Sequence, residues 1–282
     1  MYTKPTEPRS IGGVLDDGLR LWMAAFSRAW PIAIMGQLLL AVPLVMYWLQ
    51  FGAPVGVQQP MVAMMRGSIG LSLAYMVVSI AAIGFHNAVI AQTDAATKTA
   101  ERTIGESLAI GFRLLGRAFL MGILVGLAVA IPVGVLFVIL VGAPMLWRVT
   151  VGGLAFLALC YAIGKIILAA VILIVEDKGA SESLGRSWTM TSGHWWRVAT
   201  ILTVLVIVIV AVFLFVGIIA GVVAATTGST SAISGILVQV ISVLGNTLIS
   251  PLYSAVLISI YYDLKLRKEG ADLAGRVNAL AV

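Results

Sequence analysis

Residues Phe119 to Val141 read FLMGILVGLAVAIPVGVLFVILV and contain no polar side chain. A membrane-spanning helix needs about 20 consecutive, mostly apolar residues, so this run is long enough to cross a bilayer. Hydrocarbon offers no hydrogen-bond partner to the backbone, and a helix satisfies its own N–H and C=O groups within one segment. The run therefore predicts a transmembrane helix.

The composition extends this interpretation to the whole chain. Of its 282 residues, 61% are apolar and only 11% are charged, and the mean hydropathy is +1.07. Soluble domains carry about a quarter charged residues, and a soluble fold with so few could not cover its surface. We expect an all-α polytopic membrane bundle that forms a single integral membrane domain over residues 1–282.

Five other stretches have the same length and apolar character. Together with the first they predict six spans, at about residues 31–50, 68–92, 118–141, 150–175, 199–224 and 234–260. A tight turn containing Gly142, Pro144 and Arg148 separates the third span from the fourth. A polar loop from Thr226 to Ser231 separates the fifth from the sixth.

Basic residues gather in alternate connecting segments. Fifteen of the 18 Lys and Arg residues, and all 12 acidic residues, fall on one side of the predicted membrane. The other side keeps only Arg66 and Arg148, and Lys165 lies inside a span. The positive-inside rule then predicts that both termini are cytoplasmic. The net charge of +6 suits anionic headgroups rather than nucleic acid, because the charges lie in short segments between apolar runs.

Three segments that precede spans resemble one another. Residues 10–20 align with residues 103–113 and, more loosely, with residues 181–188, and each has an apolar face at helical spacing. Thr103 and Glu106 form a capping box at the start of the second. We expect three repeats, about 10–92, 103–175 and 180–262, each an interfacial helix followed by two spans, and a cytoplasmic tail over 263–282. The alternative is that these segments are bent ends of the spans.

Polar side chains enter the even-numbered spans. The sixth span carries Gln239, Ser242, Asn246, Ser250, Tyr253 and Ser254 at three-to-four spacing, and the second carries Ser72, Tyr75, Ser79, His86 and Asn87. Because an unsatisfied polar group in hydrocarbon costs several kcal/mol, about 2–7, we expect even spans inside the bundle and odd spans outside. Hydrogen bonding between helices alone would also explain the stripes. We interpret His86 as an interfacial residue.

Lys165 is the basic residue that breaks the charge pattern. It lies about 15 Å from the inner end of its span, near the predicted midplane, where a Lys is costly and marks a candidate site. The sequence predicts an anion or lipid site formed by Lys165, Tyr161, Gln239 and Asn246. The alternative is a structural Lys held by hydrogen bonds within the bundle.

A second candidate site is a charge network on the predicted cytoplasmic face. Its members are Glu176, Asp177, Asp263, Arg267 and Glu269. We expect Glu176 or Asp177 to pair with Arg267 or with an Arg of another repeat, which would hold the repeats together. A solvated run of charges is the alternative.

The sequence contains no catalytic signature that we recognise. It has no G-x-S-x-G, H-E-x-x-H or G-x-x-x-x-G-K motif, two histidines on different segments and the single Cys160. We therefore expect no enzymatic activity, cofactor, metal or disulfide.

Three stretches resemble a known bacterial family. They are residues 9–18, residues 175–197 with VEDKGASESLGRSW, and residues 261–273 with YYDLKLRKEGADL. They are similar to the membrane domain of glycerophosphoryl diester phosphodiesterases, in its stand-alone form without the catalytic barrel. The resemblance implies a bacterial inner-membrane protein and assigns no activity.

Two functions follow from these observations. The first is a non-enzymatic inner-membrane protein that organises lipid, of anionic kind, or a partner protein at the cytoplasmic leaflet. The alternative is a transporter or lipid translocator with an anion-binding cavity around Lys165. Gly122-x-x-x-Gly126 and Gly217-x-x-x-Gly221 permit close helix contact, within the bundle or in a homo-oligomer.

Overall fold

The computed structural model describes residues 4–51, 69–98, 101–227 and 232–280. Within these ranges the chain forms helices and turns and no strand. Arg66 and residues 228–231 of the predicted polar loop lie outside them.

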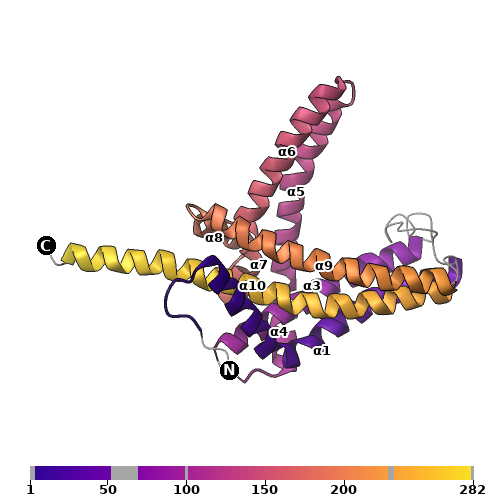
Figure 1. Ribbon diagram of the computed structural model, residues 1–282, viewed down its shortest axis with the longest axis horizontal. Coiled ribbons are helices and arrows are strands. Elements are labelled where there is room, and N and C mark those ends of the chain that lie inside the picture. The colour runs from indigo at the N-terminus through magenta and orange to yellow at the C-terminus, as the bar shows by residue number, and fades with distance from the viewer. Residues whose placement is uncertain (1–3, 52–68, 99–100, 228–231, 281–282) are drawn as a thin grey trace.

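Helices follow one another through the described ranges (Figure 1). Their bounds are α1 Ile11–Phe51, α3 Ile69–Thr97, α4 Ile104–Arg113, α5 Leu115–Leu140, α6 Met145–Ile166, α7 Ala169–Val175, α8 Ala180–Thr191, α9 Trp195–Thr227 and α10 Ala232–Leu280. In these ranges six segments are long and apolar enough to cross a membrane: Ile11–Met46, Ile69–Thr97, Leu115–Leu140, Met145–Val175, Trp195–Thr227 and Ile233–Gly270. The predicted all-α fold with six spans is confirmed, and α10 continues through Asp263 without a break.

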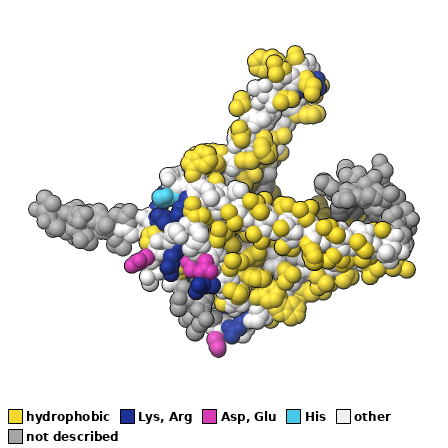
Figure 2. All heavy atoms as spheres, viewed as in Figure 1, with side chains coloured by type: hydrophobic (Ala, Val, Ile, Leu, Met, Phe, Trp, Pro, Cys, Tyr) yellow, Lys and Arg dark blue, Asp and Glu magenta, His cyan; other side chains and the backbone are white. Residues whose placement is uncertain are grey.

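The protein core lies at one end of the molecule. Residues that are at most 1% exposed come from five helices and meet there: Leu21, Ile90, Ile172, Ile201 and Leu257. Most charged side chains gather at the same end, whereas hydrophobic side chains predominate over the visible parts of the other helices (Figure 2). We call this the charged end and define it by Arg9, Glu176, Arg186, Arg197 and Asp263. Its apolar surroundings are the kind that lipid covers.

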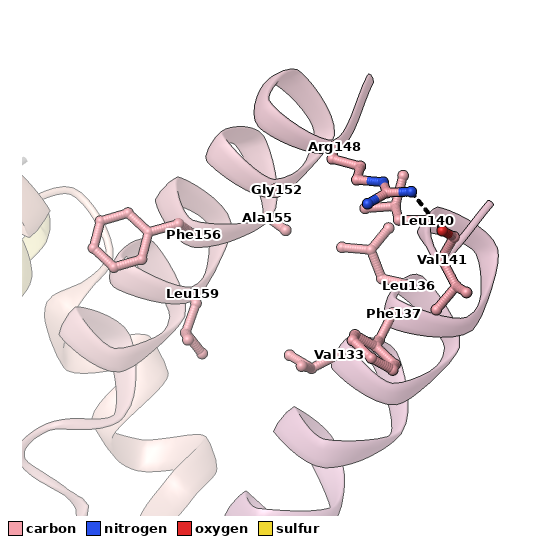
Figure 3. Close-up of a pocket in the computed structure, with 10 residues that line it drawn as sticks. All are labelled: Val133, Leu136, Phe137, Leu140, Val141, Arg148, Gly152, Ala155, Phe156 and Leu159. Atoms are coloured by element: carbon pink, nitrogen blue, oxygen red, sulfur yellow. Dashed lines mark hydrogen bonds between the residues drawn. The ribbon is translucent and has the colours of Figure 1, made fainter. Parts of the chain in front are cut away.

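Helices α5 and α6 form a hairpin that points away from the other spans (Figure 1). At its tip the Arg148 guanidinium donates to the carbonyls of Ala143, at 2.8 Å, and Val141, at 2.6 Å. These bonds satisfy carbonyls at the end of α5, which have no donor within the helix. Below the tip, a gap of about 630 Å³ between the two helices is lined by apolar side chains such as Phe137 and Leu159 (Figure 3).

Two of the three predicted interfacial helices exist as separate elements. Helix α4 begins with the predicted capping box of Thr103 and Glu106, and α8 ends before a turn in which Gly193 has a φ of +84°. The prediction is wrong for the first repeat, because α1 runs unbroken from Ile11 to Phe51. When the segments are aligned, Ala24 of the first repeat corresponds to Gly193 of the third. Because Ala does not readily adopt the left-handed backbone of that turn, α1 continues as a helix at this position.

The predicted division into inner even spans and outer odd spans holds only in part. The most apolar windows of α5 and α9 are 0% and 11% buried, as expected for outer helices. The first span is an exception, with 39% of its window buried, whereas the window of α3 is only 6% buried. Close packing accounts for the burial of the first span. Within the span a Cβ on Gly36 would lie 2.8 Å from Phe85 Cβ of α3, and before it a Cβ on Gly18 would lie 2.9 Å from Val256 Cγ2 of α10.

The contact between α4 and α3 makes a test of this packing. A Cβ on Gly111 would lie 2.2 Å from the Gly84 carbonyl oxygen, which is backbone and cannot rotate away. We expect Gly111→Ala to lower the free energy of unfolding by about 2 kcal/mol or more, since overpacking typically costs 1–3 kcal/mol. Thermal unfolding in detergent measures it.

Gly105→Ala is the matched control on the same helix, because nothing lies within 4 Å of its Cβ position. It should keep or slightly raise the stability, as Ala favours helix over Gly. Equal melting temperatures for the two variants would contradict the packing of α4 on α3.

Candidate functional site

Three consecutive residues in the second half of α10 each contact a different part of the chain. The Tyr261 hydroxyl donates to Glu176 Oε1 at 2.8 Å, after α7, and the Tyr262 hydroxyl donates to Asp94 Oδ1 at 2.8 Å, on α3. Asp263 accepts from Arg197 Nε of α9 at 2.9 Å. The triplet therefore connects α10 to three segments that are distant in sequence.

Asp263 is the most connected of these side chains. Its carboxylate, only 4% exposed, also accepts from Arg267 Nε at 3.1 Å and from the Arg9 backbone N–H at 2.9 Å. The Arg9 carbonyl in turn accepts from Arg267 Nη2 at 2.7 Å and from Arg197 Nη2. This arrangement holds the N-terminal segment between α9 and α10, with one buried negative charge between two guanidinium groups.

The other members of the predicted charge network fall into two groups. Arg186 of α8 lies 3.3 Å from Glu176 and 3.2 Å from Glu269, so it connects these two carboxylates. Asp177 pairs instead with Arg113 and Arg117 at the junction of α4 and α5, at 3.2 and 2.8 Å. Asp177 has a φ of +52°, a conformation that Asp tolerates better than most residues. Arg267 contacts Asp263 rather than Glu176 or Asp177.

A pocket of about 850 Å³ opens beside the Tyr261–Asp263 triplet. Its charged lining consists of Lys4, Lys265, Arg267 and Glu269, and its other polar side chains are Thr6, His194 and Tyr262. Lys4 Nζ lies 3.9 Å above the centroid of the Tyr262 ring, and Lys265 Nζ lies 5.8 Å from that of Tyr261. The pocket thus places three cations and one carboxylate around a space large enough for a headgroup.

The electrostatics of the pocket favour an anion. Burial and the nearby charge of Lys265 lower the pKa of Lys4. Burial, with the charges of Arg267, Lys268 and Arg197, lowers the pKa of His194. Burial disfavours a charge of either sign, but the neighbouring cations that also lower both pKa values would favour a bound negative charge. Our sequence interpretation did not assign this role to Lys4, Lys265 or His194, because only the fold brings positions 4, 194 and 265 together.

Lys165 has different neighbours from those predicted. Its ammonium donates to Ser192 Oγ at 3.0 Å and lies 5.4 and 5.5 Å from the ring centroids of Tyr161 and Trp188. Gln239 and Asn246 lie on α10, and the Asn246 amide donates to Ser242 of its own helix. Among the described residues α6 packs on α5, α8 and α9, and α10 is not one of its main neighbours. The structure therefore joins Lys165 to Tyr161 but not to Gln239 or Asn246.

A second contact places the helical turn before Lys165 against α9. The Trp195 ring of α9 donates to the Tyr161 carbonyl at 3.2 Å, one helical turn before Lys165. Trp195 is two residues from Arg197, which belongs to the charged end. These contacts place Lys165 beside α8 and the start of α9, close in the fold to the charged end.

Comparison with known proteins gives one result. A family model described as a domain of unknown function, DUF7847, matches residues 23–264. Neither the curated proteins nor the solved structures gave a match. The resemblance to the membrane domain of glycerophosphoryl diester phosphodiesterases stays a prediction.

The Asp263 arrangement yields a stability prediction. Asp263→Asn removes the negative charge between Arg197 and Arg267, which are 17% and 27% exposed. Breaking a buried pair leaves an uncompensated charge and costs about 3 kcal/mol, so the melting temperature in detergent should fall clearly.

Asp16→Asn is the control, because Asp16 is 57% exposed and pairs with Arg20 of the same helix. An exposed pair contributes about 0–1 kcal/mol. A loss of stability no larger for Asp263→Asn than for Asp16→Asn would show that the buried carboxylate does not hold the charged end together.

Proposed function

We propose that this chain, which belongs to the DUF7847 family of unknown function, is a non-enzymatic integral membrane protein that binds anionic lipid headgroups at its charged end. The distribution of basic residues supports a cytoplasmic location for this end and for both termini. The sequence resemblance supports the bacterial inner membrane as its location.

The observation that carries the proposal is the basic pocket beside Tyr261–Asp263. Lys4, Lys265 and Arg267 face it, against Glu269 as the acidic side chain of its lining. Phosphate oxygens of a headgroup would accept hydrogen bonds from these ammonium and guanidinium groups. Near an anionic membrane surface each Lys or Arg contributes about 1 kcal/mol to binding.

The surroundings of the pocket favour lipid over a soluble anion. Trp188 and Trp196 are 45% and 79% exposed at the same end, and Trp is enriched where a membrane meets water. The apolar surfaces of α5, α6 and α9 begin directly beside this end (Figure 2). A headgroup in the pocket would have its acyl chains beside exposed apolar helices.

Removal of two pocket cations tests lipid binding. The double variant Lys4→Gln, Lys265→Gln should bind phosphatidylglycerol about 30-fold more weakly, because two contributions of about 1 kcal/mol are lost. Native mass spectrometry of protein in a neutral detergent, titrated with phosphatidylglycerol or phosphatidylcholine, measures both affinities.

Arg148→Gln is the matched control: it removes a cation at the hairpin tip, where the guanidinium serves backbone carbonyls. It should leave the affinity for phosphatidylglycerol unchanged. The proposal is overturned if the double variant binds as tightly as the parent chain, or if the parent chain does not prefer phosphatidylglycerol to phosphatidylcholine.

His194 gives a pH dependence with a definite sign. The pKa of His194 in the folded state lies below the ordinary 6.5. As the pH falls below 6.5, His194 therefore becomes protonated in the unfolded chain while it stays neutral in the folded chain. Stability contributed by neutral His194 is therefore present above about pH 6.5 and is lost as the pH falls through the folded-state pKa. Acidification should lower the melting temperature of the parent chain more than that of His194→Asn.

Added phosphatidylglycerol should reduce the extra loss of melting temperature that the parent chain shows on acidification, because a bound anion favours protonated His194. Equal effects of acidification on the two proteins, with and without lipid, would contradict the placement of His194 among Arg197, Arg267 and Lys268.

A further inference from the structure

Another hollow lies in the apolar part of the molecule, away from the charged end. It has a volume of about 310 Å³ and is bounded by α1, α3 and α10. Its polar lining comes from all three helices: Gln37 of α1, Ser79 and His86 of α3, and Ser250 of α10. These residues include members of both polar stripes, which the fold brings to one place.

The hollow lies deep along α10. Ser250 precedes Asp263 by 13 positions on one continuous helix, which corresponds to about 20 Å at 1.5 Å per residue. The hydrocarbon layer of a bilayer is about 30 Å thick. The four polar side chains therefore lie within the apolar layer, where His86 is not the interfacial residue that the sequence suggested.

These side chains retain unused hydrogen-bonding capacity. In the described part of the chain, no protein group forms a hydrogen bond with the side chains of Gln37, Ser79 or His86. Other polar side chains of α10 differ: Ser242, Asn246 and Thr247 each donate to a carbonyl of their own helix. Polar groups at this depth need partners, and a hollow of this size holds water or a small ligand.

The local packing keeps the hollow in shape. A Cβ on Gly36 would lie 2.8 Å from Phe85 Cβ, so α1 and α3 touch beside it. The His86 ring lies 6.4 Å from the Tyr253 ring, centroid to centroid. Pro251, next to Ser250, lacks the N–H that would bond to the Thr247 carbonyl, so this carbonyl of the continuous α10 has no helical donor.

The chemistry of the lining indicates the class of ligand. Neutral His, the Gln amide and two Ser hydroxyls each donate and accept hydrogen bonds, and none carries a fixed charge. A phosphate or carboxylate needs donors and positive charge, and an ammonium needs acceptors and negative charge. Hydroxyl groups, which both donate and accept, match the set.

We propose that this hollow is a binding site for an uncharged polyhydroxy group, carried by a free polyol or by the sugar headgroup of a neutral glycolipid. It involves none of the residues of the basic pocket. If the hollow binds no polyhydroxy group, the proposal of lipid binding at the charged end still stands. If the charged end binds no anionic lipid, the proposal for the hollow still stands.

Thiol labelling tests the site in the full-length protein. In a Cys160→Ser background, which removes the exposed native thiol, Ser250→Cys should react at least tenfold faster with the neutral 2-hydroxyethyl methanethiosulfonate than with its anionic sulfonatoethyl analogue. Ala255→Cys, at a position 0% exposed on the same helix, is the control and should react with neither.

Protection then distinguishes the two sources. Sorbitol added in detergent, or monoglucosyl diacylglycerol added to nanodiscs, should slow the neutral reaction, and protection by either supports a polyhydroxy site. His86→Ala should abolish the protection while leaving the labelling. The proposal is overturned if Ser250→Cys labels no faster than Ala255→Cys, if the anionic reagent reacts equally fast, or if neither compound protects.

Discussion

The buried carboxylate of Asp263 is the interaction on which the charged end depends. It lies between Arg197 and Arg267 and accepts the Arg9 N–H, so one side chain positions α9, α10 and the N-terminal segment. A charge with this little exposure is tolerated only when it is paired and hydrogen-bonded, which fixes the geometry of its partners. The neighbouring Tyr261 and Tyr262 extend the same junction to Glu176 and Asp94.

The position of this junction explains the rest of the architecture. Helices that meet at the charged end bury their side chains there, whereas the α5–α6 hairpin diverges and exposes apolar surface along its length (Figure 1). Because Lys4 and Lys265 belong to segments that the Asp263 junction brings together, the basic pocket exists only in the folded protein. If the pocket binds an anion as proposed, stability of the junction and anion binding are coupled.

Much of the fold could be predicted from the sequence, because a long apolar run in a membrane satisfies its backbone hydrogen bonds by forming a helix. The unbroken α1 could not, since it depends on Ala24 in place of a turn glycine and on close packing of Gly18 against α10. The charge network was predicted as a set of residues, but its pairings, such as Asp177 with Arg113, required the distances. The sequence singles out Lys165 because it is a basic residue inside a predicted span. Its contacts with α8 depend on how the helices pack, which its position along one span does not reveal.

Headgroup photo-crosslinking tests the central claim, anionic lipid at the charged end, most directly. Phosphatidylglycerol with a diazirine in its headgroup would be activated in nanodiscs, and the labelled peptides mapped by mass spectrometry. We predict crosslinks to residues 4–8, His194 and 262–270, which unlabelled phosphatidylglycerol competes away and phosphatidylcholine does not. Crosslinks spread along α5 and α6 or centred on Arg148, or equal competition by phosphatidylcholine, would contradict the account.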